Sequence, residues 1–101
     1  MEKFFKPRSV AVIGASSKPN KVGNVVFTQV QKKFKTYPIN SKGKKILGKK
    51  SYKSILDVKG KIDLAVIAIP ARFVISVLEE CAKKGVKNVI IISSGFKEIG
   101  N

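Results

Sequence analysis

Residues 9–23 read Ser-Val-Ala-Val-Ile-Gly-Ala-Ser-Ser-Lys-Pro-Asn-Lys-Val-Gly and decide the fold of this chain. The β-branched apolar run at 10–13 predicts a strand that is buried on both faces and ends at Gly14. A small, polar, lysine-bearing loop follows, and Gly23 opens an amphipathic helix. The free N–H groups and the positive dipole end of such a helix face the loop. The segment therefore predicts a phosphate-binding corner for a nucleotide-like ligand.

The composition fits one small folded domain without histidine. Of the 101 residues, 44% are hydrophobic and 27% are charged, which is typical of a globular chain. No apolar run reaches the roughly 18 residues of a membrane helix, and the first residues do not resemble a signal peptide, so we expect a cytoplasmic protein. The lone cysteine, Cys81, is expected to be a small core residue. We predict no catalytic residue and no metal site, and the lack of histidine excludes histidine chemistry within this chain.

The chain is strongly basic, with a formal net charge of +15. Between Lys32 and Lys61, eleven basic residues accompany a single acid, Asp57. A field of this sign attracts polyanions such as nucleic acid, anionic membranes or phosphorylated ligands. A lysine-rich solubilising surface explains the same residues equally well.

Apolar periodicity organises the chain as alternating strands and helices. The expected strands are residues 10–13, 36–39, 62–69 and 89–92, with 46–47 as a further edge strand. The expected helices are residues 24–34, 51–58 and the segment between Pro70 and Gly85. Repeated units of this length imply parallel strands joined by right-handed crossovers. We therefore predict an α/β fold, a single Rossmann-like three-layer domain over residues 1–101, with a mostly parallel sheet of about four to five strands.

The ligand site of such a sheet lies beyond the carboxyl ends of the strands. The segments that leave those ends are residues 14–21, 40–45, 70–72 and 93–95. All four are small, polar, basic or kinked. We expect them to converge on one rim and to face a common ligand.

The glycine corner departs from the dinucleotide fingerprint Gly-x-Gly-x-x-Gly, because Ala15 and Ser16 follow Gly14. The acidic residue that holds a ribose hydroxyl in that fingerprint is also missing, and Asn40 and then Lys42 occupy its region. A lysine at this place is able to hold an additional phosphate. NADP and coenzyme A both fit this pattern.

Several segments in register resemble the amino-terminal region of the NDP-forming acyl-CoA synthetases, the ADP-forming acetate–CoA ligases. The likeness lies in Phe-Phe-Lys-Pro-Arg-Ser-Val-Ala-Val-Ile-Gly-Ala-Ser at 4–16, Tyr-Pro-Ile-Asn at 37–40, Ile-Asp-Leu-Ala-Val-Ile at 62–67, Ile-Pro at 69–70 and the stretch 85–95. It covers nearly the whole chain. More distantly, the chain is similar to the succinyl-CoA synthetase α-subunit and to small stand-alone CoA-binding proteins.

The resemblance implies a CoA-binding domain and assigns roles to twelve residues. The residues implied to hold the CoA phosphates are Gly14, Ala15, Ser16, Lys21, Val22 and Gly23. Those implied to face the adenosine 3′-phosphate are Asn40 and Lys42. The adenine and pantetheine path would be lined by Ile69 and Pro70, and Ser93 and Ser94 would lie near the thiol end.

The chain also departs from the family pattern. The family's catalytic histidine and ATP-grasp module lie in later domains, and its CoA-binding domain runs about one helix–strand unit further. We therefore expect a module that is inactive alone and that works with further domains or subunits of an acyl-CoA synthetase, or self-associates.

Plainer interpretations exist for each feature. Gly14 also fits a simple tight turn, Lys42 a solvated loop, and Pro70 the start of a helix. Ser93 and Ser94 also fit helix caps. If Gly14 serves the ligand, Gly14→Val should abolish binding and leave the fold intact. At the level of function, a stand-alone CoA- or NADP-binding regulatory protein and a basic nucleic-acid binder remain as alternatives.

Overall fold

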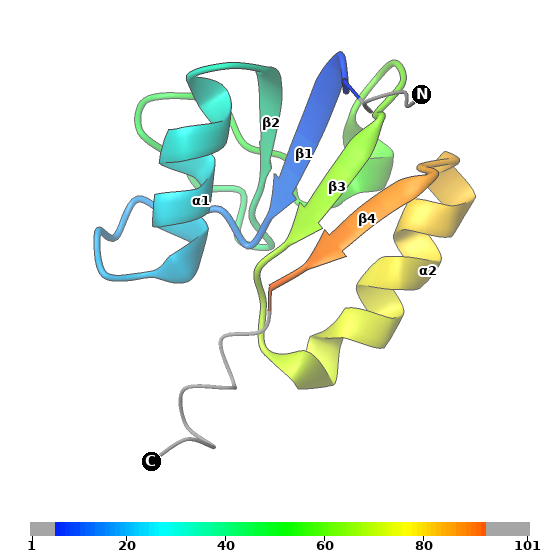
Figure 1. The fold of residues 1–101 in the computed structure, drawn as a ribbon. Coiled ribbons are helices and arrows are strands. Elements are labelled where there is room, and N and C mark those ends of the chain that lie inside the picture. The colour runs from blue at the N-terminus through cyan, green and yellow to red at the C-terminus, as the bar shows by residue number, and fades with distance from the viewer. Residues whose placement is uncertain (1–5, 93–101) are drawn as a thin grey trace.

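The computed structural model describes residues 6–92, which alternate between strands and helices (Figure 1). The strands are β1 (Ser9–Ile13), β2 (Lys35–Ile39), β3 (Leu64–Ile67) and β4 (Asn88–Ile91). The α-helices are α1 (Val22–Gln31) and α2 (Val74–Lys84), and two short 3₁₀ helices are η1 (Ile55–Asp57) and η2 (Ala71–Phe73). Among these residues, no helix is long and apolar enough to cross a membrane.

The four strands form one parallel sheet in the order β2-β1-β3-β4. Ala11 lies at the centre, opposite Tyr37 of β2 and Ala65 of β3. Pro38 is tolerated in β2 because this strand is at the edge of the sheet. The predicted parallel α/β fold is therefore confirmed, with four strands in the described residues.

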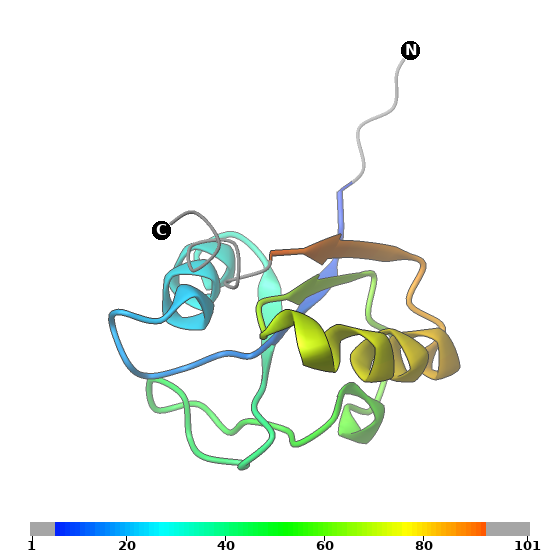
Figure 2. The same cartoon turned by 90° about the horizontal axis from the view of Figure 1, so that it is seen from below.

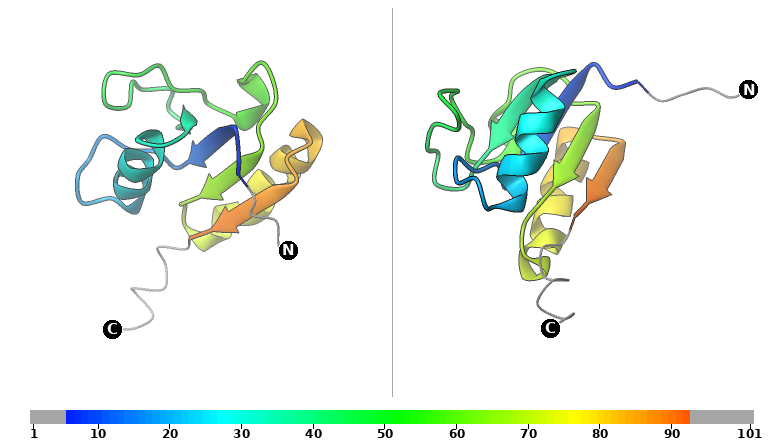
Figure 3. Two further views of the ribbon diagram at one scale, coloured as in Figure 1. Left: turned by 45° about the horizontal axis from the view of Figure 1, so that its top comes forward. Right: turned by 60° about the vertical axis from the view of Figure 1, so that its left-hand side comes forward.

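The two α-helices lie on opposite faces of the sheet, as Figures 2 and 3 show. One face of β1 presents Val10 and Val12 to Phe27 of α1. The other face presents Ala11 and Ile13 to a cluster that includes Cys81 of α2 and residues of η1. The alternation of strand side chains thus builds the three predicted layers from a strand that is buried on both faces.

The helix after Pro70 begins and ends as the sequence predicts. Pro70 precedes η2, which leads directly into α2. At the other end, Gly85 adopts a left-handed φ of 91°, and its N–H donates to the carbonyls of Cys81 and Ala82. This glycine satisfies the open carbonyl groups of the last helical turn.

Two expected elements are wrong in the segment between β2 and β3. The predicted helix over 51–58 is only the single turn η1, which Ser54 caps by accepting from Leu56 N–H at 3.1 Å. The predicted edge strand at 46–47 is reduced to one antiparallel bridge between Ile46 and Lys49. The segment instead follows the outer edge of β2, where Tyr52 pairs with Ile39. The third strand is also shorter than predicted, because only Leu64–Ile67 form β3.

Candidate functional site

The loops after β1, β2 and β3 meet at the carboxyl ends of the strands (Figure 1). The chain leaves β1 toward β2 through α1, and it leaves β3 toward β4 through α2. A crevice forms at this reversal of direction, which is where α/β sheets bind ligands. The N–H groups of Gly14 and Ala15 both donate to the Ile39 carbonyl, at 2.9 and 3.2 Å, and so fix the first loop against the second.

Gly14 and Gly23 allow the chain to turn tightly at this crevice. Gly14 has a φ of +95°, and a Cβ there would overlap the Ala68 carbonyl oxygen and lie 2.8 Å from Ile69 Cγ2. A Cβ on Gly23 would overlap the carbonyl of Gly14. This geometry contradicts the expectation that Gly14→Val leaves the fold intact, because Ala68 and Ile69, which follow β3, occupy the space of the added side chain.

The first turn of α1 supplies open donors to the crevice. Its N-cap residue is Lys21, no side chain caps it, and no acidic residue lies in the first turn. The N-terminal N–H groups of a helix lack partners within the helix and carry partial positive charge. This end of α1 is consequently suited to an anion such as a phosphate.

A cavity of about 410 Å³ lies at this place, and we call it the corner cavity. It is lined by nine predicted residues, Gly14, Ala15, Ser16, Lys21, Val22, Gly23, Asn40, Ile69 and Pro70. It is also lined by Asn20, Ser41 and Ala68, which the sequence did not single out. In the sequence, each of these three residues is next to a predicted residue, and this was the signal that could have identified them.

Asn40 connects the two loops through its side-chain amide. Its Nδ2 donates to the Ala15 carbonyl at 3.0 Å, and its Oδ1 accepts from the Lys42 N–H at 2.9 Å. Its backbone N–H donates to the Tyr52 carbonyl at 2.8 Å. Asn40 therefore lines the cavity while it positions the neighbouring backbone.

Two further side chains, which the sequence did not indicate, fix the loop between β1 and α1. Asn24 Nδ2 donates to the Ser16 carbonyl at 3.0 Å. Ser17 Oγ accepts from the Leu47 N–H at 3.1 Å and donates to the Lys45 carbonyl at 3.3 Å. The loop is thus held by contacts with α1 and with residues 45–47.

A second cavity, of about 420 Å³, adjoins the first and is strongly basic. We call it the lysine basin, and its lysines are Lys18, Lys21, Lys42, Lys44 and Lys45. It shares Ser16, Lys21 and Asn40 with the corner cavity. Lys42 therefore does not line the corner cavity with the other predicted residues. It lines the adjoining lysine basin, whose positive charge suits a second phosphate group.

A third cavity, of about 240 Å³, extends from the corner cavity along α2. We call it the apolar arm. It shares Gly14, Ser41 and Ile69 with the corner cavity, and its outer wall includes Phe73 and Val77. The three cavities together offer one ligand a central anion site, a basic side and an apolar side.

Two further residues, Arg72 and Cys81, also have defined surroundings. The Arg72 guanidinium lies 4.7 Å from the centre of the Phe73 ring, beside the start of α2. Cys81 is buried in the core as predicted. Burial, with a smaller effect from the charge of Glu80, raises the pKa of its thiol.

Residues 6–92 contain no group of three or more His, Cys, Asp or Glu side chains that could hold a metal ion. Ser93 and Ser94 lie outside the described residues.

Fold and site together define an α/β domain of the Rossmann type, with an uncapped first helix that begins beside a cavity. The chain matches the family model described as the CoA binding domain over residues 8–99, and it belongs to this family. The predicted resemblance to ADP-forming acyl-CoA synthetases is confirmed by curated relatives.

Two of these relatives are archaeal ligases. The chain is 45% identical to the α subunit of ADP-forming acetate–CoA ligase II of Pyrococcus furiosus, over 99% of this chain and 22% of that protein. It is 55% identical to the ADP-forming acetate–CoA ligase of Methanocaldococcus jannaschii, over 94% of this chain and 14% of that protein.

A solved structure extends the likeness to three dimensions. The dinucleotide-forming acetyl-coenzyme A synthetase 1 of Ca. Korarchaeum cryptofilum, in complex with phosphate and ADP, superposes with a TM-score of 0.83 at 42% identity. The match covers 96% of this chain and 22% of that one. This chain therefore corresponds to less than a quarter of the length of each of these three relatives.

Proposed function

We propose that this chain binds coenzyme A at the carboxyl rim of its sheet, as the CoA-binding module of an ADP-forming acyl-CoA synthetase. The observation that carries the proposal is the corner cavity, where the uncapped start of α1 meets the Gly14 turn. Membership of the CoA binding domain family supports the same ligand. Coenzyme A also has one group for each of the three cavities, since it carries a pyrophosphate, a 3′-phosphate and an adenine.

Each part of coenzyme A has a matching part of the rim. The pyrophosphate is assigned to the corner cavity, where backbone N–H groups of Val22 and Gly23 are available to it. The 3′-phosphate is assigned to the lysine basin, with Lys42 as its main cation. Ile69 and Pro70 line the path to adenine and pantetheine, and Ser93 and Ser94 are proposed for the thiol end.

A calorimetric comparison of four ligands tests this assignment. Coenzyme A, dephospho-CoA, NAD and NADP are titrated into the full chain under identical salt conditions. We expect coenzyme A to bind most tightly and dephospho-CoA more weakly, because only the former presents a 3′-phosphate to the lysine basin. NADP binding more tightly than coenzyme A would favour the alternative of an NADP-binding regulatory protein. Tight binding of NAD would contradict the assignment altogether.

The enzymatic part of the proposal concerns a larger assembly. The relatives named as ligases are several times longer than this chain, and this chain contains no histidine. We expect no acyl-CoA when the chain alone is incubated with an acid, ATP and coenzyme A. Turnover by the purified chain, absent from a mock purification, would show that the mechanism differs from the family route.

The partners proposed for the module are further domains or subunits of such a synthetase. Within residues 6–92, β4 is an edge strand of the sheet, and its Ile90 and Ile91 are 50% and 48% exposed, which offers apolar surface for contact. For the isolated chain we expect self-association at high concentration. Sedimentation velocity over a concentration series tests this, and a constant monomeric species would contradict it. The cytoplasmic location stays a prediction.

A further inference from the structure

The apolar arm contains a polar group that the phosphate assignment does not use. Phe73, Ser76, Val77 and Glu80 all line this cavity. Their spacing of three, four and seven residues places them on one face of the helical segment that leads into and includes α2. Glu80 is half-buried, whereas its neighbour Glu79 is exposed. The cavity wall also carries Ser41, Lys53 and Ser76, and a half-buried carboxylate requires hydrogen-bond partners.

The Glu80 carboxylate is held in a fixed orientation. Ser54 Oγ donates to Glu80 Oε1 at 2.7 Å, and the same Oγ accepts from the Leu56 N–H at 3.1 Å. Ser54 is thereby anchored at the start of η1, and η1 in turn packs against α2. Ser54 thus fixes the carboxylate of a residue that lines the cavity. An ionised carboxylate accepts hydrogen bonds and donates none.

The size of the arm suits a single ring system. Its volume of about 240 Å³ is below the range for a whole drug-sized ligand. Ile69 stands where the arm opens into the corner cavity, and the Phe73 side chain is 48% exposed at the wall. An aromatic ring and a branched aliphatic chain are suitable surfaces for the faces of a purine.

We propose that the apolar arm holds the purine base of the ligand and that Glu80 is a specificity-determining residue, which accepts a hydrogen bond from the exocyclic amine of adenine. This inference rests on the proposed binding of coenzyme A. A purine with a carbonyl in place of that amine would set oxygen against oxygen at the same point, and a site built to pair with a donor strongly rejects an analogue that lacks it.

Two ligands that differ only at this position test the inference. Adenosine 3′,5′-bisphosphate and inosine 3′,5′-bisphosphate carry the same phosphates and ribose, and only the former has the amine. Both are titrated calorimetrically into the full chain, beside coenzyme A. For the unaltered protein we expect the adenosine compound to bind about tenfold more tightly or better. Equal affinities of the two compounds, with coenzyme A still bound, would overturn the role of Glu80 alone.

The matched variants are Glu80→Gln and Glu79→Gln. The glutamine at position 80 keeps the size of the side chain but also offers N–H groups, which can donate a hydrogen bond to the inosine carbonyl. We expect the adenosine preference to fall to about twofold or less in Glu80→Gln and to persist in Glu79→Gln. An unchanged preference in Glu80→Gln would overturn the inference.

A second variant keeps the test independent of folding effects at position 80. Ser54→Ala retains the Glu80 carboxylate and removes the hydroxyl that orients it. We expect an intermediate preference in this variant, with a far-UV circular dichroism spectrum like that of the unaltered chain. If neither bisphosphate nor coenzyme A binds the unaltered protein, the proposed function itself fails, and the base site fails with it.

Discussion

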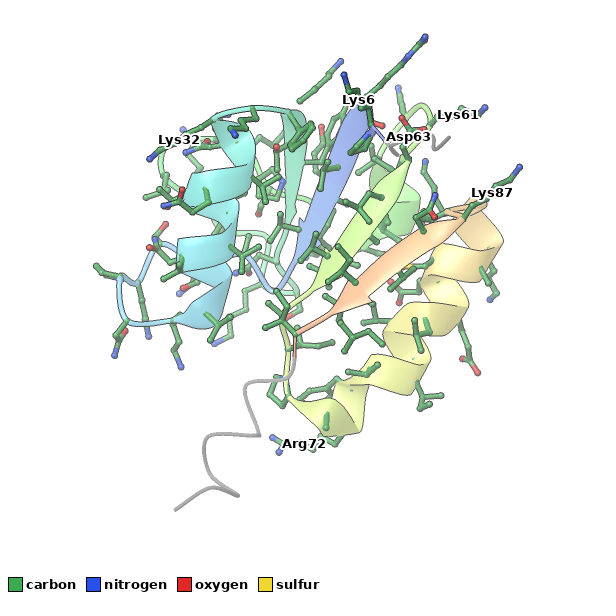
Figure 4. All side chains as sticks on the ribbon, viewed as in Figure 1. Lys6, Lys32, Lys61, Asp63, Arg72 and Lys87 are labelled. Carbon is green, nitrogen blue, oxygen red and sulfur yellow. The ribbon has the colours of Figure 1, made fainter. Side chains whose placement is uncertain are left out.

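The two ends of the sheet are both basic and both hollowed, yet only one has the construction of a ligand site. The amino ends of the strands surround a cavity of about 690 Å³ with Lys6, Arg8, Lys35, Lys59 and Lys61 around it. Figure 4 shows Lys6, Lys61 and Lys87 at this end of the molecule, together with Asp63. The carboxyl ends surround the corner cavity and its two neighbours. Positive charge alone therefore does not distinguish the two ends.

Helix direction explains the difference. In a parallel sheet with crossover helices, the helix N-termini lie at the carboxyl ends of the strands and the helix C-termini at the amino ends. The lysines near the amino ends thus face partial negative charge: Lys83 and Lys84 lie in the last turn of α2, and Lys32 is the C-cap of α1. Lys84 Nζ also donates to the Val58 carbonyl. At the carboxyl ends, in contrast, lysines and helix N-termini are positive together, which is why we propose that this end binds an anion.

The strongest test of this comparison uses two glycines with nearly the same backbone angle. Gly14 has a φ of +95° at the carboxyl end, and Gly60 has a φ of +97° at the amino end. A Cβ at Gly60 would meet nothing within 4 Å, whereas one at Gly14 would overlap the Ala68 carbonyl. We expect Gly60→Ala to cost about 1–2 kcal/mol of unfolding free energy, the cost of a left-handed residue. Gly14→Ala should cost about 1–3 kcal/mol more, because of the overlap.

Urea unfolding followed by circular dichroism measures both variants. Gly60→Ala is the control for the backbone angle, and it should bind coenzyme A as the unaltered chain does. Equal losses of stability in the two variants would mean that β3 moves away at little cost, and that the Gly14 turn is not fixed by packing.

The sequence predicts most of the fold because its main elements carry local signals. The apolar runs of β1 and β3 and the Gly85 stop of α2 were identified from residue types alone. Residues 46–58 lack any period, and their path depends on pairing of Tyr52 with the outer edge of β2. Such tertiary pairing leaves no local pattern, and the predicted helix and strand were wrong for that reason.

The site shows the same division between local and tertiary information. Nine of the predicted residues line one cavity, since the ends of parallel strands must converge. Glu80 lies on the same helical face as Phe73 and Val77, but its hydrogen bond to Ser54, 26 residues earlier, leaves no local signal in the sequence. The role of Ser17 in fixing the loop also could not be predicted from the sequence, because its hydrogen-bond partners lie about thirty residues away.

A second prediction compares one lysine from each end. Lys42 lies in the lysine basin, and Lys61 lines the cavity at the amino ends. We expect Lys42→Ala to weaken coenzyme A binding about tenfold, since a charge-assisted hydrogen bond to a phosphate contributes about 1.5–3 kcal/mol before solvent screening. The affinity for dephospho-CoA should change little.

Lys61→Ala removes the same charge from the chain and is the matched control. Calorimetry at two salt concentrations separates a local contact from the general field, which salt weakens for both lysines. Equal effects of the two substitutions on coenzyme A affinity would show that net charge, and not a contact in the lysine basin, attracts the ligand.

The smallest expected effects concern the polar side chains that connect loops at each end. Asn40 makes two side-chain hydrogen bonds at the carboxyl end, to the Ala15 carbonyl and the Lys42 N–H. Asp63 accepts from the Arg8 N–H at 2.7 Å at the amino end, in an exposed position. A typical hydrogen bond contributes about 0.5–1.5 kcal/mol net, so Asn40→Ala should lower the unfolding free energy by about 1–2 kcal/mol and Asp63→Ala by less than about 1 kcal/mol. Only Asn40→Ala should also weaken coenzyme A binding, because it releases the loops that shape the corner cavity.

Urea unfolding and calorimetry on the same preparations give the unfolding free energy and the coenzyme A affinity of each variant. If Asp63→Ala lowered coenzyme A affinity as much as Asn40→Ala, the two ends of the sheet would be coupled through β1, and the separation of a ligand end from a solvated end would not hold.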